Sequence, residues 1–260
     1  MDIVVCIKQV PDTTEIKIDP NTNTLIREGV ESIINPFDMY AIEEALRLKQ
    51  EYGGNVTAIS MGPPQVEKAL RESVAMGVDN IILLSDKKFA GADTWSTSLT
   101  LSRAITKLDN FDIILFGQQA TDGDTAQVGP GVAAHLNIPQ TCFVRKIEEI
   151  QNNKIKLERL TETGFDILEK SLPLAITVIK DINEPRLPSL RGKRKAKKAK
   201  LTIWKAEDLK LPEEEVGLNG SPTQVVKIFS PERNKQGEKY ELPPEELVDK
   251  LFNKLKELGK

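Results

Sequence analysis

Histidine and cysteine are scarce in this sequence of 260 residues, which has one histidine and two cysteines. Catalytic triads and metal sites normally use several such side chains, so we expect no catalytic residue of this kind and no bound metal. The single histidine, His135, is expected to pack on a helix or to face solvent rather than to bind a ligand. With only Cys6 and Cys142 present, a disulfide framework is not expected either.

Long apolar runs are missing as well. No run approaches the roughly 20 residues that cross a bilayer, and the chain begins in a strand-like run without a basic leader. We therefore expect a cytoplasmic protein without membrane insertion. The length suits one large α/β domain, with or without an extension.

The charge is unevenly placed, although the net charge is only −3. Residues 186–200 contain many basic side chains and no acidic one. This run has no interleaved aromatic residues and no helix-turn-helix or zinc pattern around it, so we do not expect nucleic acid as a partner. It is interpreted either as a solvated loop or as a surface beside a partner protein or cofactor.

Short apolar runs rich in β-branched residues recur along the chain, with helix-like segments between most of them. The runs are residues 3–7, 56–60, 81–84, 113–116 and 174–178. This alternation predicts an α/β fold with a mainly parallel, doubly wound sheet and helices on both faces. A hairpin over residues 12–33 and antiparallel strands over residues 154–158 and 165–168 are expected as small additions.

The most informative segment is a polar loop, residues 117–128, between a buried strand and a helix-like stretch. In α/β folds such loops bind nucleotides, because free N–H groups at the helix start point toward the phosphates. Gly117 and Gly123 permit a close approach of the backbone, and Asp122 or Asp124 is expected to cap the next helix. The alternatives are an ordinary capped turn and, for the two aspartates, acid–base or Mg²⁺ chemistry.

After residue 200 the sequence becomes polar and is punctuated by proline, and it ends in an amphipathic helix. Leu247, Leu251, Leu255 and Leu258 give this helix one apolar face. We therefore expect residues 1–200 to form the α/β nucleotide-binding domain and residues 201–260 to form a C-terminal arm. Such an arm docks either on its own domain or on another chain.

Linked motifs, in order over nearly the whole chain, identify a family. They are residues 4–12, 35–38 with 41–45, 61–64, 75–79, 117–130 and 195–198. Together they resemble the electron-transfer flavoprotein beta subunit. The resemblance implies an adenine nucleotide alpha hydrolase-like fold and a larger alpha subunit that carries FAD, on which the arm is expected to dock. In that family the beta subunit binds AMP, or a second FAD in the electron-bifurcating members.

The resemblance also implies site residues. The adenine nucleotide would be lined by Cys6, Asn35, Pro36, Phe37, Asp38, Met61, Gly117, Gln118, Gln119, Ala120, Thr121, Asp122, Gly123, Asp124, Thr125, Ala126, Gln127 and Val128. A second loop with Asp93 and Thr94 would reach a flavin ring. Leu190 would be the apolar anchor for a partner dehydrogenase, in a recognition loop near residues 184–200.

Residues 91–95 and 122–129 are similar to the electron-bifurcating subgroup, so we expect FAD, with AMP as the alternative. The resemblance then implies that NADH reduces this FAD. One electron would pass to the alpha-subunit FAD and a flavin-dependent dehydrogenase of the acyl-CoA dehydrogenase type, and the other to ferredoxin or flavodoxin. The competing interpretations are a stand-alone nucleotide-binding module resembling universal stress proteins and an adenylating enzyme. The latter should have a Ser/Gly-rich loop where this chain has residues 8–12.

Overall fold

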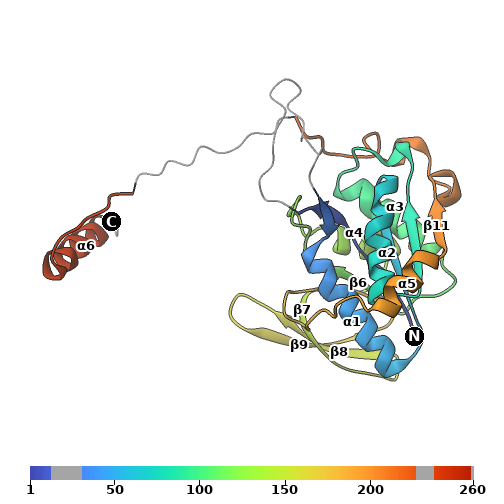
Figure 1. The fold of residues 1–260 in the computed structure, drawn as a ribbon, viewed down its shortest axis with the longest axis horizontal. Helices are drawn as coiled ribbons and strands as arrows, with labels where there is room; N and C mark the ends of the chain where they lie inside the picture. Colours follow the sequence, from blue (N-terminus) through green and yellow to red (C-terminus); the bar gives the residue numbers. More distant parts are fainter. Residues whose placement is uncertain (13–30, 227–236, 259–260) are drawn as a thin grey trace. The chain divides into compact units, whose positions relative to one another are not determined.

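The computed structural model describes residues 1–12, 31–226 and 237–258. The chain divides into a larger unit, Met1–Val226, and a smaller unit, Lys227–Lys260. The larger unit holds the sheet and the helices around it, and the smaller unit contains one helix (Figure 1). None of the helices in the described ranges is long and apolar enough to cross a membrane.

A nine-stranded sheet forms the centre of the larger unit, with the strand order β11-β5-β4-β1-β6-β10-β7-β8-β9. The pairs from β11 to β7 are parallel, whereas the pairs β7–β8 and β8–β9 are antiparallel. The bounds are β1 Asp2–Cys6, β4 Asn55–Met61, β5 Asn80–Leu84, β6 Ile113–Gly117, β7 Gln140–Gln151, β8 Lys154–Leu160, β9 Phe165–Ser171, β10 Leu174–Val178 and β11 Leu201–Trp204. The expected mainly parallel α/β fold is confirmed.

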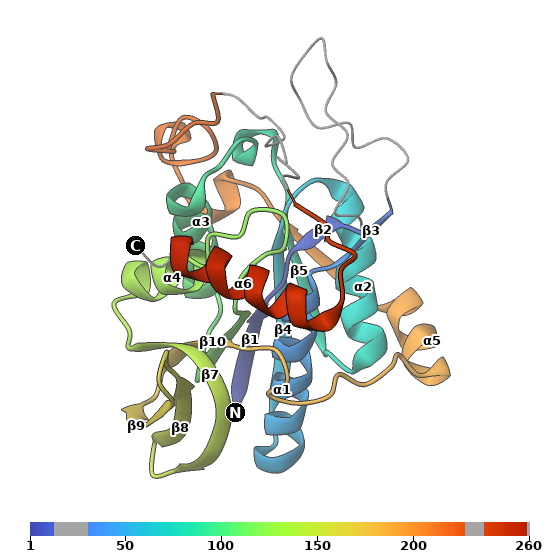
Figure 2. The same ribbon diagram turned by 90° about the vertical axis from the view of Figure 1, so that its left-hand side faces the viewer.

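A separate two-stranded antiparallel sheet pairs β2, Gln9–Pro11, with β3, Ser32–Ile34. These strands lie at the two ends of the hairpin expected over residues 12–33. Residues 13–30, which are almost all of that hairpin, lie outside the described residues. The antiparallel strands expected over residues 154–158 and 165–168 are present as β8 and β9, at the end of the sheet away from α5 (Figure 2).

Helices cover both faces of the sheet, as the pattern of apolar runs predicts. Alternate residues of β1 point to opposite sides, so Ile3 and Val5 belong to one buried cluster and Val4 and Cys6 to the other. The first cluster is covered by α1, α2 and α5, and the second by α3 and α4. The helices are α1 Pro36–Tyr52, α2 Glu67–Met76, α3 Thr94–Thr106, α4 Val128–Leu136 and α5 Leu190–Lys198; short 3₁₀ turns are η1 Pro64–Val66, η2 Lys87–Phe89, η3 Glu207–Leu209 and η4 Glu213–Glu215.

The basic run forms a helix, α5, where the sequence favoured a loop. Ser189 caps its start by accepting a hydrogen bond from the Gly192 N–H at 2.9 Å. Gly192 lies so close to the Ala75 carbonyl of α2 that a Cβ at this position would collide with it. Arg71 of α2 also donates to the Ala199 carbonyl at 3.2 Å. Packing against α2 therefore orders this segment, and exposed lysine and arginine side chains are compatible with a helix.

The expected start of the arm at residue 201 differs from the structure. Residues 201–204 form β11, which pairs with β5 at the edge of the main sheet, and the larger unit continues to Val226. Leu209, Leu211 and Val216 are buried in the same cluster as α3 and α4. These apolar residues are separated by polar ones, so the sequence of this region looks like a solvated tail although it completes the core.

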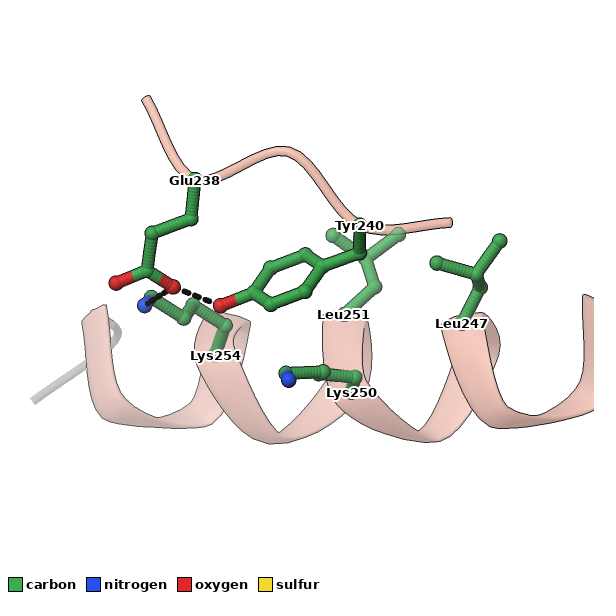
Figure 3. A pocket seen from close by; sticks show the side chains of 6 residues that line it. All are labelled: Glu238, Tyr240, Leu247, Lys250, Leu251 and Lys254. Carbon is green, nitrogen blue, oxygen red and sulfur yellow. Dashed lines mark hydrogen bonds and ion pairs between the residues drawn. The ribbon is translucent and has the colours of Figure 1, made fainter. Parts of the chain in front are cut away.

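The smaller unit contains α6, Pro244–Leu258, and a preceding segment that lies along it (Figure 3). The ring of Tyr240 lies 3.8 Å from the Lys250 ammonium, and Lys254 donates to the Glu238 carboxylate at 2.7 Å. A small pocket between the segment and the helix is lined by Glu238, Tyr240, Leu247, Lys250, Leu251 and Lys254. Val248, Leu251, Phe252 and Leu255 expose more than half of their surface, so the apolar side of α6 has little cover from the described residues.

A pair of leucine substitutions tests the revised boundary. Leu211→Ala removes a side chain that is 7% exposed, and we expect the free energy of unfolding to fall by about 2–4 kcal/mol. Leu255→Ala in α6 removes one that is 57% exposed, and we expect a change below about 0.5 kcal/mol. Urea unfolding followed by the fluorescence of Trp95 and Trp204, both in the larger unit, measures the difference. Equal small effects would place residue 211 in an arm after all.

Candidate functional site

The predicted ligand loop follows β6, at the edge of the sheet where the parallel strands β4, β1 and β6 have their carboxyl ends. Ligands of open α/β sheets bind at this edge, because the loops that leave neighbouring strands meet there. The start of α1 lies at the same edge, since residues 35 and 38 contact the loops after β1 and β6. The structure therefore brings together three of the segments that the sequence singled out.

Asn35 connects the start of α1 to the loop after β6. Its side chain is 1% exposed, and its Nδ2 donates to the Gln119 carbonyl at 2.8 Å. Its Oδ1 accepts from the Thr121 N–H at 3.2 Å. A single amide side chain thus fixes two backbone positions of the loop, and both of its polar atoms are used in doing so.

Asp38 connects the ends of two strands. Its carboxylate accepts the Lys8 N–H, just after β1, at 2.7 Å and the Gly117 N–H, at the end of β6, at 3.2 Å. It also accepts from Asn35 Nδ2 at 2.9 Å. Burial raises the pKa of the Asp38 carboxyl to about 7, although these three hydrogen bonds act in the opposite direction. We call Asn35 and Asp38 together the clamp.

Gly117 allows the clamp to close. A Cβ at this position would collide with the Asp38 carboxylate and with the backbone of Phe37, so any larger residue would push α1 away from β6. Pro36 occupies the first turn of α1, where its missing N–H costs nothing. Close backbone approach is therefore the reason for glycine at the end of this strand.

The loop beyond the clamp has a defined backbone and an exposed surface. Asp124 and Ala126 have φ values of 52° and 53°, a conformation that costs energy for residues with a Cβ. The Asp124 N–H donates to the Ala120 carbonyl at 2.8 Å, and the Gln119 side chain binds the Asp124 carboxylate. The exposed residues of the loop are Thr121, Asp122, Gly123, Asp124, Thr125 and Gln127.

The expectation that Asp122 or Asp124 caps the following helix is wrong. The residue before α4 is Gln127, and its side chain makes no capping hydrogen bond. Asp122 instead accepts from the Lys8 ammonium at 2.6 Å, and Asp124 binds Gln119. The aspartates shape the loop, and the start of α4 has no side-chain cap at that position.

The remaining predicted residues have different environments. Cys6 is buried at the end of β1, and burial, with a smaller contribution from the nearby Asp38, raises the pKa of its thiol far above the ordinary value. Met61, at the end of β4, packs against the same buried cluster. Gln118 and Val128 are partly buried at the two ends of the loop.

A second loop touches the first. The Thr94 hydroxyl donates to Gln127 Oε1 at 3.2 Å, which joins the start of α3 to the end of the ligand loop. Asp93 caps α3 by accepting from the Ser96 N–H at 3.0 Å, and it also accepts from the Thr223 hydroxyl at 2.8 Å. Its carboxylate is therefore engaged in structure. His135 packs edge-on against Trp95 with ring centroids 4.7 Å apart, as expected of a helix-packing residue.

Leu190 does not belong to this cluster. It begins α5, and its side chain is 82% exposed. Lys8, in contrast, does belong to the cluster, and reasoning from the sequence missed it. Because its partner Asp122 lies 114 positions away in the sequence, only the place of Lys8 directly after a buried strand could have drawn attention to Lys8. Among the described residues there is no group of three or more His, Cys, Asp or Glu side chains arranged to hold a metal.

Comparison with known proteins identifies relatives over almost the full length. Residues 22–209 match the family described as "Electron transfer flavoprotein domain". The chain is 51% identical over 256 residues to electron transfer flavoprotein subunit beta of Thermoanaerobacterium thermosaccharolyticum, covering 98% of both chains. It is 48% identical over 259 residues to caffeyl-CoA reductase-Etf complex subunit CarD of Acetobacterium woodii, covering 99% of this chain and 98% of the relative. It is 43% identical over 265 residues to protein FixA of Azotobacter vinelandii, covering 98% of this chain and 94% of the relative.

Because of Asp38, the free energy of unfolding should depend on pH. The pKa of Asp38 is raised from 3.8 to about 7, so the folded state holds a proton that the unfolded state has lost between these values. The free energy of unfolding should therefore fall as pH rises through this window, by at most about 1.4 kcal/mol per pH unit. In Asp38→Asn this pH dependence of the free energy of unfolding should be absent, because an amide side chain does not titrate.

Urea unfolding of wild type and Asp38→Asn between pH 4.5 and 8 measures it, with about ten points across the range. Glu162→Gln, which changes an exposed carboxylate on the turn between β8 and β9, is the control and should keep the wild-type slope. Parallel curves for wild type and Asp38→Asn would show that Asp38 is already ionised throughout.

Proposed function

The chain belongs to the electron transfer flavoprotein family as a beta subunit, and from this premise we propose that its ligand loop binds FAD and that the protein bifurcates electrons. Beta subunits of this family act in electron transfer and pair with an alpha subunit. What we add is the identity of the bound nucleotide, the route of the electrons and the residues that serve each partner.

The observation that carries the proposal is the clamp. Asn35 and Asp38 hold the loop of residues 117–128 by its backbone, and the exposed hydroxyl side chains of Thr121 and Thr125 can face a ligand. The glycine at position 123 has no protein atom closer than 4.0 Å to a Cβ built there, so the loop is open on that side. A rigid loop beside an uncapped helix start suits a nucleotide phosphate.

FAD is favoured over AMP by the second loop. FAD is longer than AMP by a phosphate and the flavin portion, so it needs a site that extends beyond the adenosine part. The Thr94–Gln127 hydrogen bond joins the start of α3 to the ligand loop, which enlarges the surface available to one ligand. AMP remains the second candidate, because the clamp and the loop alone are sufficient for it.

The work of this chain would be to bind and orient the cofactor. When bound, FAD would accept a hydride from NADH and deliver one electron to the alpha-subunit FAD and one to ferredoxin or flavodoxin. The clamp would keep the loop in place while partners come and go, and the buried Cys6 thiol would stay protonated and unreactive. We propose no residue of this chain as an acid or a base.

Two exposed apolar surfaces would serve the partners. Leu187 and Leu190 are 89% and 82% exposed beside the basic helix α5, which suits an apolar anchor with surrounding charge for an acyl-CoA dehydrogenase-like partner. The apolar side of α6 would dock on the alpha subunit. The expected location is the cytoplasm, which fits two cysteines that are both free.

The nucleotide content of the heterodimer tests the cofactor. The chain is expressed together with its alpha subunit, and the nucleotides are released by acid and separated by chromatography. We expect two FAD per heterodimer and no AMP. One FAD and one AMP would make the protein a simple electron carrier, and a heterodimer with no nucleotide bound to this chain would refute the proposed site.

Two neighbouring substitutions in α6 test its docking on the alpha subunit. Phe252→Asp places a charge on the exposed apolar side of the helix, whereas Asn253→Asp places the same charge on a polar position next to it. We expect Phe252→Asp to weaken heterodimer formation by about tenfold or more, a loss of about 1.4 kcal/mol, and Asn253→Asp to change it little. Calorimetric titration of one subunit with the other provides the dissociation constants. Equal affinities for the two variants would exclude this side of α6 from the interface.

A further inference from the structure

Lys8 has a fixed backbone at the centre of the candidate site. Its N–H donates to Asp38 at 2.7 Å, and its carbonyl accepts from the Asn35 N–H at 2.8 Å. Both clamp residues, Asn35 and Asp38, therefore bind the backbone of Lys8. The clamp therefore holds the backbone of Lys8 from both sides and sets the direction in which its side chain leaves the backbone.

The Lys8 side chain reaches over the ligand loop. Its ammonium lies 2.6 Å from Asp122 Oδ1, and the two side chains keep 48% and 32% of their surface exposed. The same ammonium lies 4.0 Å from a Cβ built on Gly123, where no side chain stands in the way. Among the ion pairs of the described residues, this is the one that brings a cation to the loop of residues 117–128.

The negative charges of the loop disfavour the binding of an anion unless a nearby cation offsets them. Asp122 and Asp124 both lie on the exposed surface of the loop, and two carboxylates repel a phosphate. Asp124 is bound to the Gln119 side chain, whereas Asp122 is bound only to Lys8 among the hydrogen bonds of the described residues. An exposed ion pair contributes little to stability, so exchanging one anion for another at the ammonium costs little.

We propose that Lys8 binds the phosphate of the nucleotide and that Asp122 is the anion which the phosphate displaces from it. The inference rests on the proposed nucleotide site and adds the residue that recognises the phosphate. Lysine suits this role because its ammonium is a compact charge that pairs with either carboxylate or phosphate oxygens. Asp122 would hold the side chain over the loop in the empty protein and compete with the ligand.

Comparing AMP with adenosine tests the role of Lys8, since the two ligands differ only in the phosphate. The full chain, freed of bound nucleotide, is titrated with each ligand by calorimetry. Lys8→Met removes the charge and keeps a long side chain, and we expect it to weaken AMP binding by about tenfold or more while adenosine binding stays within about twofold. Lys68→Met, which breaks an exposed ion pair with Glu31, is the matched control and should leave both affinities unchanged.

Asp122→Asn gives an independent reading of the same proposal. Removing the competing carboxylate should make AMP binding severalfold tighter and leave adenosine binding unchanged. Added salt should weaken AMP binding to wild type more than to Lys8→Met, because screening acts on the charge that the variant lacks. The adenosine affinity also shows that each variant retains a folded site.

Three results would overturn the inference. AMP binding that is equal in wild type and Lys8→Met would show that Lys8 does not contact the phosphate, and equal losses for AMP and adenosine would show a structural role only. AMP binding that is unchanged or weaker in Asp122→Asn would exclude displacement. If wild type binds AMP in any of these cases, the proposed nucleotide site stands without the inference; if wild type binds neither AMP nor FAD, both fail.

Discussion

The arrangement of the candidate site depends on one buried carboxylate. Asp38 lies in the first turn of α1 and accepts the N–H groups of Lys8, just after β1, and Gly117, the last residue of the adjacent parallel strand β6. Asn35 extends the same contact into the ligand loop. Buried polar groups of this kind must be satisfied or they destabilise the fold, so the loop, the helix start and the two strands are held as one piece. A site built in this way is shaped before any ligand binds.

Sequence patterns were sufficient for the framework and for the position of the loop. The strands are short apolar runs, and glycine at position 117 correctly indicated a close backbone approach. The patterns did not reveal the clamp, because Asn35 looks like a helix cap and Asp38 like an ordinary first-turn acid. They also did not pair Lys8 with Asp122, since long-range ion pairs leave no periodic signal.

Segments with little apolar character were the hardest to interpret. Residues 201–226 look like a solvated tail, yet β11 and a few separated apolar side chains complete the core. The basic run looks like a loop, yet contacts with α2 make it a helix. In both regions tertiary packing completes the local structure, and in α5 the helix propensity of lysine, arginine and alanine acts in the same direction. The amphipathic α6 was predicted from its leucine spacing alone, because a regular period of three and four residues is a strong signal.

We propose that residues 117–128, held by Asn35 and Asp38, form the nucleotide site of this electron transfer flavoprotein beta subunit. A crystal structure of the heterodimer with its natural cofactors tests this most directly. We expect an adenine nucleotide in contact with this loop, with the Asn35 side chain still hydrogen-bonded to the backbone of Gln119 and Thr121. A nucleotide of this chain bound elsewhere, or a loop that opens by breaking the clamp when the nucleotide binds, would contradict it.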